Sequence, residues 1–123
     1  GRVERVRLLG LDTPDLRQDP WGLEAREALQ RWLSDKTVRL EFDGEGRDRG
    51  NRLLAYVWLD DRLVNEQAIA EGYALAATRQ TLLRYGTRLN QAQERARLLE
   101  LGIWNPERPL RLSPAEFRRQ HPQ

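Results

Sequence analysis

The sequence predicts an α+β domain in which three short strands are interspersed with three main helices. Apolar or alternating runs at 1–11, 38–42 and 53–59 are typical of β-strands. Apolar residues spaced by three and four predict helices over about 20–34 and 85–99, with a shorter helix between them. The chain has 123 residues, of which 39% are hydrophobic and 33% charged, and this suits one domain with a core and a solvated surface.

The first strand ends in a group of polar residues. Its apolar side chains, which predict burial, are Val6, Leu8 and Leu9. Pro14 ends the strand because proline has no N–H to donate to a ladder. Asp12, Thr13 and Asp15 therefore lie where the chain leaves the core, a position suited to oxygen ligands for a hard cation. An ordinary strand exit, with Asp12 closing an Asx turn, explains the same residues.

The first helix is expected from Pro20 to Ser34, because Asp19 suits an N-cap and proline suits the first helical position. Its buried stripe comprises Ala25, Ala28, Leu29, Trp32 and Leu33. Alternation over 38–42 then indicates a half-buried strand. A loop rich in glycine and charge at 43–52 leads into the nearly continuous apolar strand at 53–59.

The second half of the chain is mostly helical. Asn65 is expected to cap a short helix that ends near Gly72. An irregular connection at 78–84 precedes the next helix, which ends at Gly102. The apolar stripe of that helix comprises Tyr85, Leu89, Ala92, Ala96 and Leu99. We assign this tyrosine and the four tryptophans to the core.

Composition narrows the available chemistry. The chain has no cysteine, and its single histidine, His121, lies near the C-terminus, so a thiol nucleophile is excluded and a histidine–cysteine zinc site nearly so. Any catalysis must use carboxylates, arginines, hydroxyls or a hard cation. Lys36 is the only lysine among 21 basic residues. Arginine grips phosphate with a planar fork, although codon bias explains most of this excess. No apolar run reaches membrane-spanning length.

The three predicted strands make a poor sheet by themselves, because unpaired strand edges need partners. We therefore expect further strands to lie upstream or to come from another chain. The absence of methionine, even at position 1, indicates a processed or excised segment. Any signal peptide would then lie outside the printed sequence.

Two arginines occupy unusual places. Arg7 lies inside the first apolar strand, where a guanidinium is costly to bury without an anionic partner. Arg52 closes the glycine-rich loop just before the buried strand. An outward-pointing Arg7 and a solvated Arg52 are the simpler explanations for each residue taken alone.

Taken together, the segments around these arginines carry a specific pattern. The matching pieces are RLLGLDTPD at 7–15, GLEA at 22–25, DRGNRLLAYV at 48–57, LVNE at 63–66, EGYA at 71–74, Tyr85, AQERA at 92–96 and GIW at 102–104. In order and spacing they resemble the micrococcal (staphylococcal) nuclease, or thermonuclease, family over about residues 5–105. The resemblance implies a five-stranded OB-type barrel flanked by three helices.

The resemblance also implies a domain division. Residues 1–105 would form the thermonuclease-like domain, with the family's first two strands and one further calcium-binding aspartate lying upstream. Residues 106–123 would form a C-terminal tail. In that tail, Ser113 and Glu116 make a capping box for a short helix through Arg119. The tail either packs on the domain or adds phosphate contacts.

The family's activity is calcium-dependent hydrolysis of phosphodiester bonds in single- or double-stranded DNA and RNA, with little sequence specificity. Carried over by position, Arg7 and Arg52 would be the catalytic arginines. Asp12 and the backbone carbonyl of Thr13 would bind Ca²⁺. Asp15 stands where the family has a glutamate general base. Family members are often exported, which favours a secreted or cell-envelope protein, but the sequence leaves the compartment open.

Three departures from the family pattern keep alternatives open. Asp15 is one methylene shorter than glutamate, and a displacement of about 1 Å can cost roughly 100-fold in rate. Gly50-Asn51 replaces a common tyrosine-glycine pair, although both can hold a turn. The family's nucleotide-stacking aromatics have no clear match at 78–83. One alternative is a weakened nuclease-like domain that binds nucleic acid or a protein partner. Another is a structural OB-type module that assembles through its sheet edges into a stable dimer independent of calcium. Separately, a homodimer formed by strand exchange could supply the missing strands.

Overall fold

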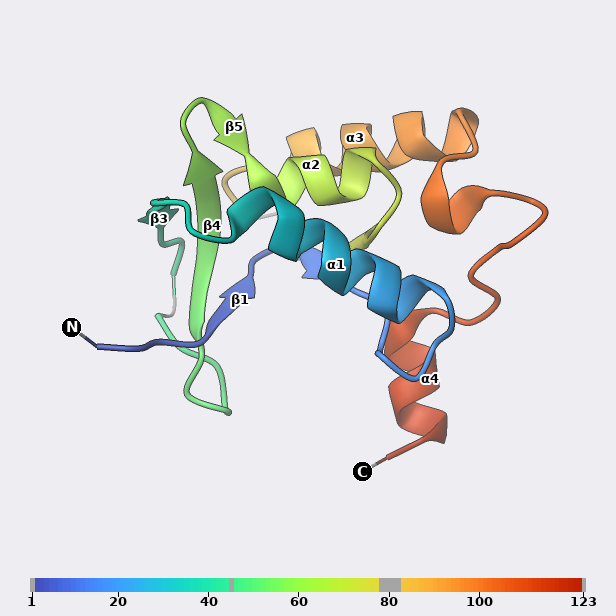
Figure 1. The fold of residues 1–123 in the computed structure, drawn as a ribbon, viewed down its shortest axis with the longest axis horizontal. Helices are drawn as coiled ribbons and strands as arrows, with labels where there is room; N and C mark the ends of the chain where they lie inside the picture. The colour runs from blue at the N-terminus through green and yellow to red at the C-terminus, as the bar shows by residue number, and fades with distance from the viewer. Residues whose placement is uncertain (1, 45, 78–82, 123) are drawn as a thin grey trace.

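The computed structural model describes residues 2–44, 46–77 and 83–122, and its architecture is α+β, as the sequence predicts (Figure 1). The strands are β1 (Val6–Leu8), β2 (Leu11–Asp12), β3 (Arg39–Glu41), β4 (Leu53–Leu59), β5 (Arg62–Leu63) and β6 (Leu75–Ala76). The helices are α1 (Trp21–Leu33), α2 (Val64–Ala70), α3 (Gly86–Leu98), the 3₁₀ turn η1 (Gly102–Trp104) and α4 (Pro114–Gln120). Within this part of the chain, no helix is long and apolar enough to span a membrane.

Strand β4 is the centre of the main sheet. β1 pairs with its first half in parallel, and β3 pairs with its second half antiparallel, in the order β1-β4-β3. Trp58 pairs with both Arg39 of β3 and Leu63 of β5, so β5 lies on the β1 side of β4. β2 and β6 form a separate antiparallel pair.

The described strands do not close into a barrel. β1 and β3 form the two ends of the sheet order, and neither has a second partner among the residues that the structure describes. The expected strand at 1–11 is also interrupted by a turn at Leu9–Gly10. Val6, predicted to be buried, is 38% exposed because β1 is an edge strand with β4 on one side only.

The core lies between β4, α2 and α3. Its most deeply buried large side chains include Tyr56, Leu63, Ile69 and Leu89. Leu89, Ala92 and Ala96 of the predicted α3 stripe are buried, but Leu99 follows the end of the helix and is 53% exposed, so its predicted burial is wrong. Tyr85 packs edge-on against Tyr56 with the ring centroids 4.7 Å apart. These contacts remove apolar surface from water, which is the main stabilising contribution to a domain of this size.

Two predicted helix caps are wrong. Pro20, rather than Asp19, occupies the N-cap of α1, and no side chain caps that helix. Leu63 occupies the N-cap of α2, so Asn65 lies inside the helix. The polar side chain of Asn65 is fully buried, and it forms hydrogen bonds with strands outside the helix. By contrast, the Ser113 hydroxyl accepts a hydrogen bond from the Glu116 N–H, so the predicted cap of α4 is confirmed.

Asn65 joins α2 to both β1 and β4. Its Oδ1 accepts a hydrogen bond of 2.8 Å from the Val57 N–H of β4, and its Nδ2 donates one of 2.8 Å to the Leu9 carbonyl just after β1. A longer contact of 3.4 Å joins Nδ2 to the Ala55 carbonyl. Along one edge of β4, the pairing with β1 ends at Ala55 and the pairing with β5 begins at Trp58, and the Asn65 amide lies between the two.

We predict that Asn65→Ala lowers the free energy of unfolding by about 2 to 4 kcal/mol, because it leaves a buried N–H and a buried carbonyl without partners. Urea denaturation followed by circular dichroism measures the change. Asn105→Ala is the matched control, since Asn105 accepts only an exposed local hydrogen bond from the Glu107 N–H. Equal midpoints for the two variants would contradict this role for Asn65.

Candidate active site

A hollow of about 980 Å³ lies where β1 turns into β2, beside β6 and α4. Arg7 and Asp12, both singled out from the sequence, line it, together with Leu54 of β4. Arg118 and Arg119 of α4 also line it. The first strand exit and the C-terminal tail therefore share one surface, although more than 100 positions separate them in the sequence.

The turn between β1 and β2 depends on Gly10. Its φ is +77°, and a Cβ at this position would lie 2.5 Å from Leu89 Cδ1 of α3. The Gly10 carbonyl also accepts a hydrogen bond of 2.8 Å from the Ala77 N–H, just after β6. Glycine permits both the left-handed backbone and this close approach. The turn thereby directs Asp12 into the β2–β6 pair, at the wall of the hollow.

Arg7 lies on β1, and Arg52 immediately precedes the neighbouring strand β4. In the parallel register, Arg7 is opposite Leu54, two residues after Arg52. Paired residues project from the same face of a sheet, so Arg7 shares its face with Leu54. Arg7 is exposed, and its side chain makes no hydrogen bond or ion pair with the rest of the described chain. The Arg7 side chain points outward, as the simpler interpretation expects, and it lines the hollow.

Arg52 is held by Asp48 rather than left in solvent. The Asp48 carboxylate accepts hydrogen bonds of 2.9 Å from the Arg52 N–H and 2.8 Å from its Nε. The hydrogen bonds from Arg52 hold the pKa of Asp48 below its ordinary value. Asn51, at a φ of 62°, donates its N–H to the Asp48 carbonyl, so the Gly50-Asn51 pair holds the turn as expected.

The polar residues after β1 lie close together. One guanidinium, that of Arg118, donates hydrogen bonds of 3.2 Å to Asp12 Oδ1 and 2.8 Å to the Thr13 carbonyl. Its Nε lies 3.6 Å from Asp15 Oδ2. One guanidinium therefore contacts oxygens of Asp12, Thr13 and Asp15, each through a different nitrogen.

Asp15 is tied closely to its own loop. Its Oδ1 accepts hydrogen bonds from the Arg17 N–H (3.0 Å) and Nε (2.9 Å), and its Oδ2 accepts one of 3.2 Å from Nη2. These bonds from Arg17, with a smaller contribution from Arg118, lower the pKa of Asp15 from its ordinary 3.8 to about 2. Gly22 of α1 packs against this loop so closely that a Cβ there would lie 2.0 Å from the Asp15 carbonyl oxygen.

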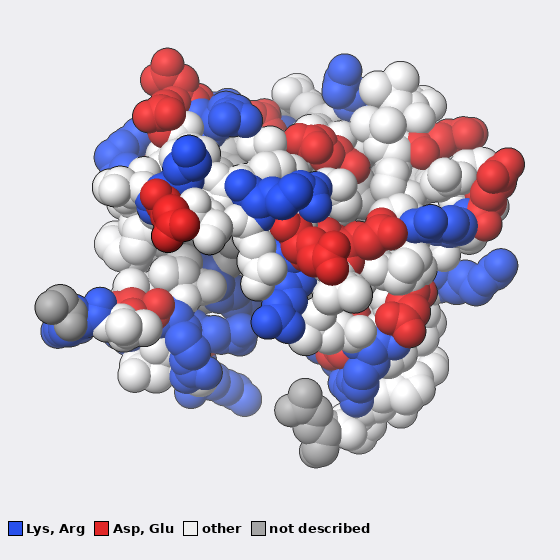
Figure 2. Space-filling model, viewed as in Figure 1, with Lys and Arg blue, Asp and Glu red and all other residues white. Residues whose placement is uncertain are grey.

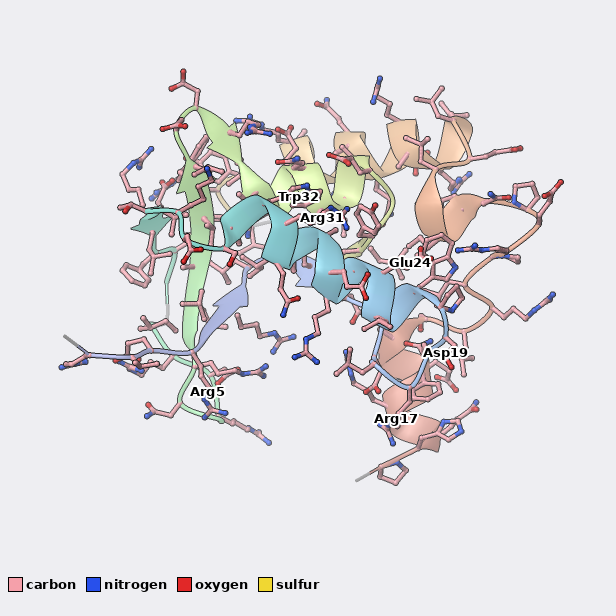
Figure 3. All side chains as sticks on the ribbon, in the orientation of Figure 1. Arg5, Arg17, Asp19, Glu24, Arg31 and Trp32 are labelled. Atoms are coloured by element: carbon pink, nitrogen blue, oxygen red, sulfur yellow. The ribbon has the colours of Figure 1, made fainter. Side chains whose placement is uncertain are left out.

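The C-terminal tail is docked beside this loop (Figure 1). Gln18 Nε2 donates to the Leu112 carbonyl (2.8 Å), and Trp21 Nε1 donates to the Arg108 carbonyl (2.7 Å). Figure 3 shows Arg17 extending alongside α4, where its guanidinium lies 5.2 Å from the centre of the Phe117 ring. No periodicity or motif in residues 106–123 indicates this docking site, and for that reason sequence analysis did not identify Arg118 as a site residue.

The atoms that Arg118 contacts on Asp12, Thr13 and Asp15 are all oxygens, the type of ligand that a hard cation prefers. Within residues 2–44, 46–77 and 83–122, however, there is no group of three or more His, Cys, Asp or Glu placed to hold a metal. The family's nucleotide-stacking aromatics have no clear match at 78–83, and residues 78–82 of that segment lie outside the described residues.

Basic side chains gather near this end of the sheet. Figure 2 shows them at the lower left, over the N-terminal segment and the loop at 43–52. Figure 3 labels Arg5 there, and its guanidinium donates a hydrogen bond of 2.8 Å to the Gly50 carbonyl. Exposed guanidinium groups of this kind attract and position a polyanion such as a phosphodiester backbone.

Comparison with known proteins identifies relatives of this chain. A family described as "Staphylococcal nuclease homologue" matches residues 5–106. The "Thermonuclease" of Staphylococcus hyicus is 37% identical over 110 residues, and that of Staphylococcus intermedius is 38% identical over 109. Each alignment covers 85% of this chain and 65% of the relative, so the chain spans slightly less than two thirds of these proteins. "Endonuclease YncB" of Bacillus subtilis (strain 168) is 31% identical over 112 residues, which cover 85% of this chain and 53% of that protein.

We predict that Arg17→Ala raises the pKa of Asp15 from about 2 toward 3.8, since the Arg17 hydrogen bonds are the largest cause of the depression. A carboxyl ¹³C NMR titration measures the value. Because the folded-state pKa is depressed, the pair stabilises the protein above about pH 4, and this contribution is lost as pH falls toward 2. Arg118→Ala is the control and should produce a smaller rise, and an unchanged value in Arg17→Ala would contradict the assignment.

Proposed function

Because the chain belongs to the staphylococcal nuclease family, we propose that it is a calcium-dependent endonuclease that hydrolyses phosphodiester bonds of DNA and RNA with little sequence specificity. One observation carries the proposal. Arg7 and Asp12 line the same hollow, and the oxygens of Thr13 and Asp15 converge beside Asp12. A guanidinium that can bind a phosphate, that of Arg7, thus lies in the same hollow as Asp12, whose carboxylate can bind a cation.

Arg7 and Arg52 are proposed to stabilise the transition state. Attack on a phosphodiester places additional negative charge on the equatorial oxygens of phosphorus, and fixed guanidinium groups favour that charge. Asp48 holds Arg52 in place through two hydrogen bonds from Arg52, so little reorganisation is needed when substrate binds. Arg7 is free of described partners, so its donors are available to a phosphate.

Asp12 and the Thr13 carbonyl are proposed to hold Ca²⁺. Carboxylate and backbone carbonyl oxygens are the donors this ion prefers. When bound, a hard cation supplies positive charge that polarises a phosphate. The protein's own contribution is to fix the two donors: the Gly10 turn and the pairing with Leu75 hold Asp12 at the wall of the hollow.

Asp15 is proposed to orient the attacking water. A carboxylate with a pKa of about 2 is ionised at neutral pH and accepts hydrogen bonds, but it is a weak base. This property favours a second candidate function, a weakened nuclease-like domain that binds nucleic acid or a protein partner. Cleavage assays separate the two.

For the fold, we propose that the domain completes an OB-type barrel with strands beyond those described. The free edges of β1 and β3 are the positions where such strands would pair. A second copy of the chain, joined by strand exchange, is one source of these strands, and the resulting homodimer remains part of the proposal.

We predict that Arg7→Ala and Arg52→Ala each reduce kcat for calcium-dependent cleavage of single-stranded DNA by about 100-fold or more, the usual cost of losing one donor to a developing oxyanion. Cleavage is measured on gels with calcium and with chelator. Arg62→Ala is the matched control: it removes the same charge at the other end of β4 and should leave the rate unchanged. Calcium-dependent cleavage at the wild-type rate in Arg52→Ala would refute the catalytic role of Arg52. Absence of calcium-dependent cleavage by the folded wild-type protein would refute the nuclease assignment.

Asp15→Glu is expected to raise kcat about tenfold, because the longer side chain restores the reach of the family's glutamate and a misplaced catalytic group is costly. The measurement is the initial rate at saturating DNA and calcium. Asp61→Glu, at the exposed turn between β4 and β5, controls for adding a methylene to a surface acid. An unchanged or lower rate in Asp15→Glu would mean that aspartate already serves the reaction fully.

A further inference from the structure

Arg118 contacts the same oxygens that the proposed function assigns to calcium. Its guanidinium donates to Asp12 Oδ1 at 3.2 Å and to the Thr13 carbonyl at 2.8 Å. It also lies 3.6 Å from the Asp15 carboxylate. Within the described chain, no other cationic side chain contacts Asp12 or the Thr13 carbonyl. Arg118 therefore supplies the positive charge at this position.

The helix that carries Arg118 is docked by contacts that do not involve it. The Leu112 and Arg108 carbonyls accept hydrogen bonds from Gln18 and Trp21, and Pro114 is buried. The Ser113 cap fixes the first turn of α4. Arg118 is thus held near Asp12 by the fold itself, at a high effective concentration that does not depend on protein concentration.

A guanidinium and a divalent cation cannot use these oxygens together. Arg118 already occupies Asp12 Oδ1 and the Thr13 carbonyl, and two cations at such a short separation repel each other. The Arg118 side chain is 46% exposed, so it has solvent to move into while α4 stays docked. Occupation of the oxygens by one cation therefore requires that the other leaves.

We infer that Arg118 is a built-in competitor of calcium, through which the C-terminal helix lowers the calcium affinity of the site. This inference rests on the proposed function for its calcium site. It assigns a role to a residue outside the matched family region, 5–106, and so to a property of this chain rather than of the family domain. The helix would set the calcium concentration at which the enzyme becomes active.

Calcium titration calorimetry at constant ionic strength, without nucleic acid, tests the inference. Arg118→Ala and Arg118→Gln should bind calcium about fivefold more tightly than wild type, the fold-change equivalent to an exposed ion pair of about 1 kcal/mol. Arg119→Ala is the matched control, because it removes the same charge from the same helix and wall of the hollow, but Arg119 pairs with Glu116 instead. Its calcium affinity should remain near that of wild type.

The possible outcomes separate the inference from the proposed function. Tighter binding confined to the Arg118 variants supports the competition. Equal or weaker binding in both Arg118 variants overturns it and leaves the calcium site intact, and an equal gain in Arg119→Ala overturns it in favour of general electrostatics. Absence of calcium binding in every variant overturns the calcium site and the competition together. Circular dichroism of each variant without calcium establishes that it is folded.

Discussion

The buried amide of Asn65 is the contact on which the arrangement of the site depends. It accepts from Val57 and donates to Leu9, and it fills the gap between β1 and β5 along the edge of β4. A buried polar group of this kind is favourable only when its partners are in place, so it specifies one register for the strands. That register sets Arg7 two residues beyond Arg52, and the Leu9 contact fixes the start of the turn that delivers Asp12. The Asn65 side chain therefore contributes both to the stability of the fold and to the geometry of the site.

Around that frame, arginine–carboxylate pairs set the charge of the site. Asp48 orients Arg52, Arg17 holds both oxygens of Asp15, and Arg118 spans Asp12, Thr13 and Asp15. The planar guanidinium makes each arrangement directional, because its donors lie in one plane at fixed angles. Codon bias remains a sufficient explanation for the scarcity of lysine in the whole chain. At Arg17 and Arg118, however, the planar guanidinium contacts two or more acceptor atoms at once, and at Arg52 two of its nitrogens contact Asp48 Oδ2.

Several features of the fold followed from local patterns, and the errors share a physical cause. The α+β class, the α3 stripe as far as Ala96, the strand at 53–59 and the cap at Ser113 were predictable, because periodicity and capping chemistry act within a few residues. The caps assigned to Asp19 and Asn65 were wrong. Asparagine is favoured at helix ends. At position 65, however, its amide forms hydrogen bonds with Val57, eight residues away, and with Leu9, 56 residues away, so it lies inside the helix. Burial of Val6 was also mispredicted, because an apolar residue does not indicate whether its strand lies at an edge.

The sequence by itself determined which residues can take part in the chemistry. Without cysteine and with one terminal histidine, only carboxylates, hydroxyls, carbonyls and arginines were available, and Arg7, Asp12, Thr13, Asp15 and Arg52 stood out by type and position. Tertiary structure alone decided the pKa, the orientation and the charged neighbours of these residues. The pKa of Asp15 depends on Arg17 geometry, Arg52 depends on the Asp48 turn, and the cation at Asp12 comes from a helix 106 residues away. Such long-range charge contacts leave no local pattern, because they depend on how distant segments pack rather than on the spacing of neighbours.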